Sequence, residues 1–429
     1  MRIAFYTLGC KVNQYETELL SGLFHSEGFD VVSHADEADV YVVNSCTVTA
    51  AGDSKTRKAL HRLRREHPGA LIALTGCFPQ AFPDAAEQLP EADVITGSKS
   101  RHALVGAVKR ALSTGERVIE ITPHTKDEVF EEMNISSFAE RTRAFVKIQD
   151  GCERYCSYCI IPKARGFIRS KPLDSLKKEL SSLAENGYLE IVLVGINLSS
   201  YGKDLGLRLI DAIEAACSVK GIERVRLGSL EPELLSDEDI LRMSCQPKLC
   251  PQFHLSLQSG CDETLRRMNR HYDTAEYRRI VDRLRKCFPG CAITTDIMVG
   301  FPGETEEEFE RSLAFARSIR FAKAHVFAYS VREGTRAAAM DGQLPNAVKE
   351  ERSRRMIKTT GETAAVFLKE QIGQTVPVLF ESRQNGLGLQ GYTPNYSPVV
   401  VRTDEPLTGK IQPVRITDVT EGLCIGELI

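Results

Sequence analysis

Short apolar runs alternate with stretches of helical periodicity along the first third of the chain. The apolar runs predict buried strands at Arg2–Leu8, Asp39–Asn44, Leu71–Thr75 and Asp93–Thr96. Between them, apolar residues recur at helical spacing over Asn13–Phe24, Asp53–Glu66 and Arg101–Leu112. Strands that alternate with helices form a parallel sheet covered on both faces. The N-terminal part is therefore predicted to be an α/β sheet domain.

The same alternation resumes near residue 143 and runs through the middle of the chain. Strands are predicted at Ala144–Gln149, Ile191–Val194, Arg224–Gly228, Phe253–Gln258, Ala292–Met298 and His325–Tyr329. Helices such as Asp174–Asn186 and Thr274–Cys287 separate them. Units of this kind predict a curved, partly closed parallel barrel with its functional edge where the strands end.

The last part of the chain has a different texture. A charged helix is predicted over Val348–Ile372. Short alternating strands with Gly, Pro and Asn turns follow, at Val376–Glu381, Leu387–Tyr392, Pro398–Arg402, Gly409–Val419 and Leu423–Leu428. This pattern predicts a small antiparallel β-barrel.

Composition argues against a disulfide-bonded, secreted or membrane-spanning protein. The chain has 429 residues, a formal net charge of −3 and 13 cysteines. An odd cysteine count in a long chain is a poor disulfide framework and suits a reducing compartment. We find no signal-like N-terminus and no apolar run long enough to span a membrane. We therefore expect a soluble cytoplasmic protein with no membrane partner.

One loop carries a compact cysteine motif, Cys152-x3-Cys156-x2-Cys159. Three thiolates on a tight loop can hold three irons of a [4Fe-4S] cluster and leave the fourth iron open to a ligand. The alternatives are three unrelated buried thiols or a zinc site. Zinc favours a fourth Cys or His at ribbon-like spacing, and none follows in the sequence.

A second set of cysteines follows the predicted strands of the first domain. Cys10, Cys46 and Cys77 each come just after a strand, and Gly9, Ser45 or Gly76 precedes each one. Ligands of open α/β sheets bind at the carboxyl ends of strands, so these thiols are expected to converge. Cysteine is also a common buried residue, which is the alternative reading. We infer a second three-cysteine cluster with an open iron.

The cysteine loop resembles the signature of the radical S-adenosylmethionine (radical-SAM) superfamily, in which the open iron chelates the methionyl group. That resemblance implies that motifs after successive strands bind the cofactor. The expected cofactor-binding residues are Tyr158, Gly195, Asn197, Ser229, Gln258, Arg270, Gly300 and Gly303. Arg270 is the cation expected to pair with the methionyl carboxylate.

The two cysteine trios together resemble the methylthiotransferases, over essentially the whole chain. The opening LGCKVNQYE (Leu8 to Glu16) is similar to the branch that acts on threonylcarbamoyladenosine in tRNA, and GYTPNYSPV (Gly391 to Val399) resembles an RNA-binding TRAM domain. The resemblance divides the α/β chain into residues 1–115, a flavodoxin-like domain with the auxiliary cluster, a linker at 116–137, a radical-SAM partial (βα)6 barrel at 138–368, and a TRAM barrel at 371–429.

Several residues are candidates for contact with RNA. The basic run Lys55–Arg65 and the charges after the cysteine loop are expected to meet phosphates, although a solvated face is the common reading of such runs. Two tyrosines are expected to stack on bases or to plug the barrel end. The candidates are Lys55, Arg57, Lys58, Arg62, Arg65, Lys163, Arg165, Tyr392 and Tyr396.

The resemblance implies an enzyme that adds a methylthio group to C2 of N6-threonylcarbamoyladenosine at position 37 of tRNA, next to the anticodon. The chemistry rests on two [4Fe-4S] clusters and S-adenosylmethionine, without a side-chain acid or base. The expected partners are tRNA, a flavodoxin or ferredoxin as electron donor and a sulfur source, and the expected state is a monomer. The alternatives are the same chemistry on isopentenyladenosine or on a ribosomal-protein aspartate, and a non-catalytic iron–sulfur carrier or zinc protein.

Overall fold

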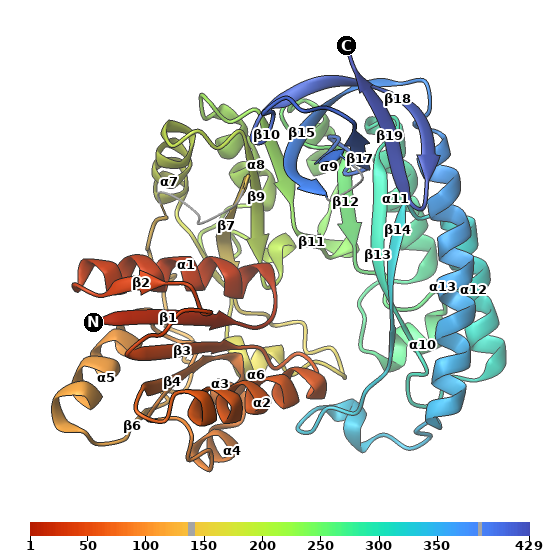
Figure 1. Cartoon of the computed structure of the whole chain (residues 1–429). Helices are drawn as coiled ribbons and strands as arrows, with labels where there is room; N and C mark the ends of the chain where they lie inside the picture. The colour runs from red at the N-terminus through yellow and green to blue at the C-terminus, as the bar shows by residue number, and fades with distance from the viewer. Residues whose placement is uncertain (136–141, 385–387) are drawn as a thin grey trace.

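A computed structural model describes residues 1–135, 142–384 and 388–429. Three bodies lie next to one another in Figure 1: an N-terminal sheet domain at the lower left, a central body of strands and helices, and a C-terminal barrel at the top. The predicted boundary between the linker and the core, at residues 137 and 138, lies outside the described residues. So does Leu387, with which one predicted strand begins.

The N-terminal domain is a parallel sheet in the strand order β2-β1-β3-β4-β5-β6. Its strands are β1 (Arg2–Thr7), β2 (Asp30–Val32), β3 (Val40–Ser45), β4 (Leu71–Gly76), β5 (Val94–Thr96) and β6 (Val118–Glu120). Its helices are α1 (Lys11–Ser26), α2 (Ala50–Glu66), α3 (Cys77–Ala81), α4 (Pro83–Glu87) and α5 (Arg101–Thr114). The predicted strands and helices are present, and the edge strands β2 and β6 add to them, because both are short and largely exposed and so leave no apolar run in the sequence.

Helices cover both faces of this sheet. Leu20 and Phe24 of α1 pack with α5 against one face, whereas Leu60 and Leu63 of α2 pack against the other. The basic residues of α2 are thereby left toward solvent, since its apolar stripe faces the sheet. The two-sided burial explains why β3 reads as a continuous apolar run.

The central body contains two four-stranded sheets in the orders β10-β9-β7-β8 and β11-β12-β13-β14. Their strands are β7 (Arg143–Asp150), β8 (Arg169–Ser170), β9 (Glu190–Gly195), β10 (Arg224–Leu227), β11 (Ser229–Leu230), β12 (Gln252–Leu255), β13 (Ala292–Val299) and β14 (Lys323–Ala328). The predicted third strand corresponds to β10, and after Gly228 the chain continues as the unpredicted strand β11, which belongs to the other sheet. A parallel bridge between Val225 of β10 and Leu249, which precedes β12, connects the two sheets.

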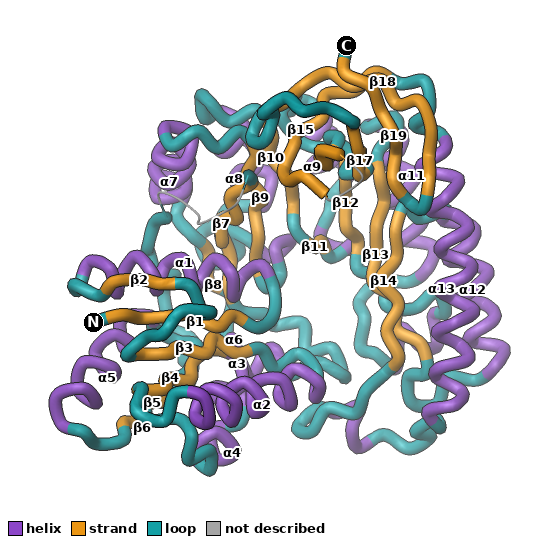
Figure 2. Tube along the Cα trace, viewed as in Figure 1, coloured by secondary structure: helices purple, strands orange, loops and turns teal. Residues whose placement is uncertain are grey.

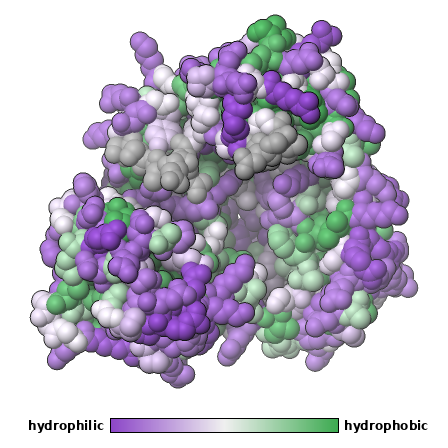
Figure 3. Space-filling view, in the orientation of Figure 1, coloured by the Kyte–Doolittle hydropathy of each residue, from purple (hydrophilic) through white to green (hydrophobic). Residues whose placement is uncertain are grey.

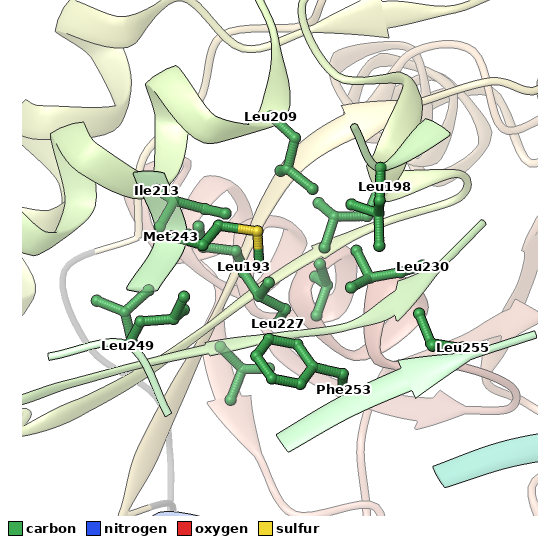
Figure 4. Close-up of a cluster of buried hydrophobic side chains, with 14 of the residues drawn as sticks. Leu193, Leu198, Leu209, Ile213, Leu227, Leu230, Met243, Leu249, Phe253 and Leu255 are labelled. Carbon is green, nitrogen blue, oxygen red and sulfur yellow. The ribbon is translucent and has the colours of Figure 1, made fainter. Parts of the chain in front are cut away.

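The helices of the central body are α6 (Ile161–Arg165), α7 (Leu173–Glu185), α8 (Leu209–Ser218), α9 (Asp237–Ser244), α10 (Asp262–Arg267), α11 (Thr274–Cys287), α12 (Glu306–Ile319) and α13 (Asn346–Lys369). Most of them pack on the outer side of the strands, whereas α6 contacts α3 of the N-terminal domain. Figure 2 shows α12 and α13 outside β13 and β14. Figure 4 shows the buried cluster on the outer side, where Leu193, Leu227 and Phe253 meet Ile213 and Met243. The alternation of buried outer residues with polar inner ones follows from the two-residue period of a strand.

The C-terminal segment is a closed barrel in the order β15-β16-β17-β19-β18. Its strands are β15 (Thr375–Gln384), β16 (Gly388–Tyr392), β17 (Pro398–Val401), β18 (Ile411–Thr420) and β19 (Leu423–Leu428). The pairing is antiparallel as predicted, except that β17 and β19 run parallel. The barrel contacts the edge of the core where β7, β9 and β10 begin, since Arg224 donates to the carbonyls of Pro377 and Tyr392.

Candidate active site

Cys10, Cys46 and Cys77 follow three neighbouring strands of the N-terminal sheet, as predicted. Cys10 precedes α1, Cys46 follows β3, and Cys77 begins α3 directly after β4. Burial raises the pKa of the Cys46 thiol and raises that of Cys77 to about 12, and the neighbouring thiols of the trio act in the same direction. The three thiols are therefore close enough at this sheet edge for Cys10 to raise the pKa of Cys46, and for both to raise that of Cys77.

The backbone before these cysteines allows the close approach. Gly9 has φ +112°, and a Cβ there would lie 2.6 Å from the Cβ of Cys46. Gly76 has φ +100°, and its Cβ would lie 2.6 Å from the carbonyl oxygen of Ser45. An alanine at either position would be strained and would clash, so glycine is required for the strand ends to come together.

Cys152, Cys156 and Cys159 lie on the loop between β7 and α6, at the carboxyl edge of the core strands. The amide of Cys152 donates to the carbonyl of Gly166 at 3.0 Å, and that of Cys159 donates to the carbonyl of Cys156 at 3.0 Å. Ser157 ties the loop to α10 by donating its hydroxyl to the carbonyl of Arg267 at 2.9 Å. These bonds fix a tight loop that presents three sulfurs.

The protonated thiols of this loop are held in a desolvated environment. Burial raises the pKa of Cys152 to about 11 and that of Cys159 to about 12, with a further contribution from Cys156. Thiolates bind soft metals, and metal binding replaces the proton that burial retains. Three thiols on one loop therefore fit a soft metal group.

Neither trio has the geometry of a site for a single metal ion. Within residues 1–135, 142–384 and 388–429, no three Cys, His, Asp or Glu side chains are close enough to share one ion. The ligands of a four-iron cluster bind separate irons and stand farther apart than the ligands of zinc.

Two of the predicted cofactor-binding residues contact the cysteine loop. Asn197 places its Nδ2 3.9 Å from the sulfur of Cys152, and the Nη1 of Arg270 lies 3.2 Å from the sulfur of Cys156. Arg270 also forms an ion pair with Glu231 and donates to the hydroxyl of Tyr272 at 3.2 Å. The cation is thus fixed beside the loop by Glu231, a residue for which the sequence predicted no role.

The other predicted cofactor-binding residues are spread along the same edge. Tyr158 is half-buried with its ring 6.4 Å from that of Phe301, and Ser229 is exposed at the start of β11. Gln258 has φ +63° after β12, and Gly300 and Gly303 have φ of +71° and +74°. Gly195 ends β9. Gly195, Gln258, Gly300 and Gly303 therefore lie at or shortly after the end of a strand, as the sequence predicted.

Sequence reasoning missed Gln149, although it ends a predicted strand. Its Oε1 accepts from the amide of Asn197 at 2.7 Å, and its Nε2 donates to the carbonyl of Gly151 at 2.8 Å. Gln149 therefore links the turn that carries Asn197 to the start of the cysteine loop. Its place at the strand end was the only available signal.

Arg165 connects the two cysteine sites. Arg165, the last residue of α6, donates from Nε to the sulfur of Cys77 at 3.1 Å. Cys77 also packs in one apolar cluster with Ile160 and Ala164, which directly follow the core loop. The second trio is therefore adjacent to the element that carries the first.

Three family models match the chain. The Radical SAM superfamily matches residues 146–316, the uncharacterized protein family UPF0004 matches residues 2–97, and the TRAM domain matches residues 369–429. The chain is 36% identical to the Threonylcarbamoyladenosine tRNA methylthiotransferase MtaB of Bacillus subtilis, over 96% of this chain and 93% of that protein. The chain belongs to the radical-SAM tRNA methylthiotransferases, in the MtaB-like branch.

This methylthiotransferase is also similar to a relative that is named for a different substrate and to a solved structure. It is 37% identical to the tRNA-2-methylthio-N(6)-dimethylallyladenosine synthase of Caldicellulosiruptor saccharolyticus, over 99% of this chain and 91% of that one. Its fold is similar to the radical S-adenosylmethionine methyltransferase TsrM of Kitasatospora setae, with a TM-score of 0.61 and 14% identity over 79% of this chain and 74% of that one. The predicted enzyme class, fold class, S-adenosylmethionine cofactor, one [4Fe-4S] cluster and tRNA substrate class are confirmed.

One residue of this methylthiotransferase was assigned wrongly from sequence. Arg165 was predicted to meet RNA phosphates, but its side chain is fully buried. It is bound by Glu16 at 2.5 Å and by Asn13 at 3.1 Å, besides Cys77. A charge next to a metal-binding loop gives no sign of which way it points, and here it points inward.

The tyrosines of the C-terminal barrel are also placed differently from the base-stacking prediction. Tyr392 and Tyr396 stack on each other, with ring centroids 4.6 Å apart. The guanidinium of Arg226 lies 4.6 Å from the Tyr396 ring, and that of Arg143 lies 5.1 Å from the Tyr392 ring. The two rings therefore pack on each other and on arginines of the core, at the interface between the barrel and the core.

The remaining candidates for RNA contact stay accessible. Lys55, Lys58, Arg62 and Arg65 are exposed on α2, Lys163 is exposed beside the cysteine loop, and Arg57 is half-buried. Arg57 lies over the Phe78 ring at 5.3 Å. In the described parts of the chain, no helix has the length and apolar character to cross a membrane.

Proposed function

We propose that this enzyme adds a methylthio group to C2 of N6-threonylcarbamoyladenosine at position 37 of tRNA. The support is the name of the Bacillus subtilis relative and the opening motif that runs from Leu8 to Glu16. Isopentenyladenosine at the same position is the second candidate, because a relative of equal similarity is named for dimethylallyladenosine.

We propose that the enzyme binds two clusters. Cys152, Cys156 and Cys159 would hold the cluster that serves S-adenosylmethionine, and the trio Cys10, Cys46 and Cys77 would hold the second. An iron–sulfur cluster with S-adenosylmethionine supplies a carbon radical able to break an unactivated C–H bond, which acid–base chemistry cannot do. The contact of Arg165 with Cys77 is the observation that supports the proposal, because it joins the helix that follows the first donor set to a residue of the second.

The chain's own residues would bind and orient the cofactor. Asn197 and Arg270 offer hydrogen-bond donors beside the cysteine loop, and Glu231 fixes the Arg270 guanidinium. The remaining proposed contacts are Tyr158, Gly195, Ser229, Gln258, Gly300 and Gly303. The glycines among them allow a planar ligand to approach the backbone.

The tRNA would reach this edge along exposed cations. Lys55, Lys58, Arg62 and Arg65 lie on α2, which begins four residues after Cys46, and Lys163 follows Cys159. Phosphate contacts of this kind position the nucleic acid without reading its sequence. A flavodoxin or ferredoxin as electron donor, a separate sulfur source and a monomeric state complete the proposal, with modules at residues 1–115, 138–368 and 371–429.

Nucleoside mass spectrometry of tRNA tests the substrate. In cells that lack this protein, 2-methylthio-N6-threonylcarbamoyladenosine should disappear and N6-threonylcarbamoyladenosine should accumulate. Restoring the gene should restore the methylthio nucleoside. Loss of the methylthio derivative of isopentenyladenosine instead would assign the second candidate.

A further inference from the structure

The inner face of β14 is open to solvent. His325 and Phe327 pair in register with Asp296 and Met298 of β13, and Phe327 is 50% exposed. The alternate residues Ala324 and Val326 pack against the outer core instead. Figure 3 shows the molecular surface hollowed at the centre of the drawn face, between the N-terminal domain and the right-hand half of the core. The exposed side chains of β14 therefore border a space inside the partial barrel.

Lys11 reaches the same space from the opposite side. It is the first residue of α1 and follows Cys10 directly. Its ammonium lies 5.7 Å from the centroid of the Phe145 ring, on the inner face of β7. Its side chain contacts solvent. Lys11 therefore carries a positive charge into the barrel next to the proposed second cluster.

The charge of Lys11 has no carboxylate partner in the described part of the chain. Glu190 is the carboxylate that acts on it, and Arg226 already binds Glu190 at 2.9 Å. Arg143 and Arg226 also act on Lys11 and add to the positive surroundings. An unpaired cation in a partly enclosed space is unfavourable until an anion occupies that space.

His325 lines the opposite wall of this space. Burial lowers the pKa of His325, Asp296 acts in the opposite direction, and the charges of Lys323, His254 and Lys11 add to the lowering. Asp296 lies 3.3 Å from the Nε2 of His254, whose Nδ1 is 3.1 Å from the Thr294 hydroxyl. Among the described residues, the Asp296 carboxylate of this wall therefore faces His254, and Lys11 and His325 are further polar groups that border the space.

We propose that Lys11 binds the carboxylate of the N6 substituent of the target adenosine and thereby selects a threonylcarbamoyl group over an isopentenyl group. This inference rests on the proposed function. A threonylcarbamoyl group carries a carboxylate, whereas an isopentenyl group is apolar and would desolvate the cation without compensation. Phe327 lies nearer the cluster edge than His325 along β14 and presents a flat ring for the base.

Binding of short RNAs to the holoenzyme tests this assignment. The probes are an anticodon stem-loop with N6-threonylcarbamoyladenosine at position 37, the same RNA with the carboxylate as its methyl ester, and the same RNA with isopentenyladenosine. Wild type should bind the carboxylate form at least about tenfold more tightly than the ester, measured by fluorescence anisotropy. The variant Lys11→Gln should bind both forms equally, and Lys11→Arg should keep the preference.

Lys286→Gln is the matched control, since it removes the same charge from an exposed position on the outer helix α11. It should keep the wild-type preference. For Lys11→Gln, KM for the carboxylate RNA should rise about tenfold, whereas reductive cleavage of S-adenosylmethionine should be unchanged. That cleavage readout and the iron content separate lost recognition from a damaged cluster.

Equal affinity of wild type for the carboxylate RNA and its ester would overturn the inference, even if Lys11→Gln folds poorly. So would a full carboxylate preference retained by a Lys11→Gln protein. Either result, with methylthiolation of the threonylcarbamoyl RNA intact in wild type, leaves the proposed function standing. Methylthiolation of the isopentenyl RNA alone by wild type would instead refute the proposed function.

Discussion

The Nε of Arg165 lies 3.1 Å from the sulfur of Cys77, and this contact crosses between two domains. Arg165 ends the helix that follows the cysteine loop of the core, whereas Cys77 begins α3 of the N-terminal domain. The same guanidinium binds Glu16 of α1. A side chain from one module therefore forms part of the proposed metal site of the other.

Replacing Arg165 by Met should destabilise the protein by about 3–5 kcal/mol, because Glu16 would stay buried with one cation fewer. Thermal unfolding under anaerobic conditions measures the loss. Arg311→Met, which breaks the exposed pair with Glu263, should cost less than about 1 kcal/mol. Equal losses in the two variants would contradict the structural role of Arg165.

Glu16 should make the stability depend on pH in the acid range. Burial alone would raise the pKa of Glu16, but Arg101, Arg165 and Lys147 outweigh it and hold the pKa well below the usual 4.5. A depressed folded-state pKa adds stability that is present above the unfolded-state pKa and is lost as the pH falls below it. The unfolding midpoint of the metal-free wild type should therefore drop steeply as the pH falls below about 4.5.

Glu16→Gln should lower the midpoint at neutral pH and flatten its decline in acid. The control Glu27→Gln removes an exposed carboxylate that pairs with Lys109, and it should leave the wild-type slope unchanged. A Glu16→Gln protein with the same acid slope as wild type would show that another group titrates.

Gly9→Ala should remove the second cluster and spare the first. The new Cβ would lie 2.6 Å from the Cβ of Cys46 at φ +112°, so Cys46 must move. Iron per chain should fall from about eight to about four, with reductive cofactor cleavage retained. Gly28→Ala, at φ +85° with open space around it, is the control and should keep the full iron content.

The sequence was sufficient for the longer helices and strands and for the placement of both cysteine trios, because strand ends and loop spacing are local patterns. It did not predict the burial of Arg165, since whether a charge faces solvent depends on Glu16, which lies 149 residues away. It did not predict the stacking of Tyr392 on Tyr396 for the same reason, because Arg143 and Arg226 come from other strands. The sequence also did not predict β11, because a strand of two residues is too short to leave an apolar pattern.

The exposed lysines of α2 should contribute to tRNA affinity through charge. The double variant Lys55→Gln and Lys58→Gln should weaken binding and reduce the salt-dependence slope by about 2, since each phosphate contact contributes nearly one unit. Filter binding at several salt concentrations measures both. The same double change at Lys177 and Lys178, exposed on α7, should leave the slope at the wild-type value.

The most direct measurement follows iron, cofactor cleavage and methylthiolation together in Cys46→Ala, with Cys156→Ala as its counterpart. Cys46→Ala should hold about four irons, still cleave S-adenosylmethionine reductively, and form no methylthio nucleoside. Cys156→Ala should lose both activities. If Cys46→Ala methylthiolated tRNA at the wild-type rate, or lost cofactor cleavage while keeping the core cluster, the division of labour between the two cysteine sites would be wrong.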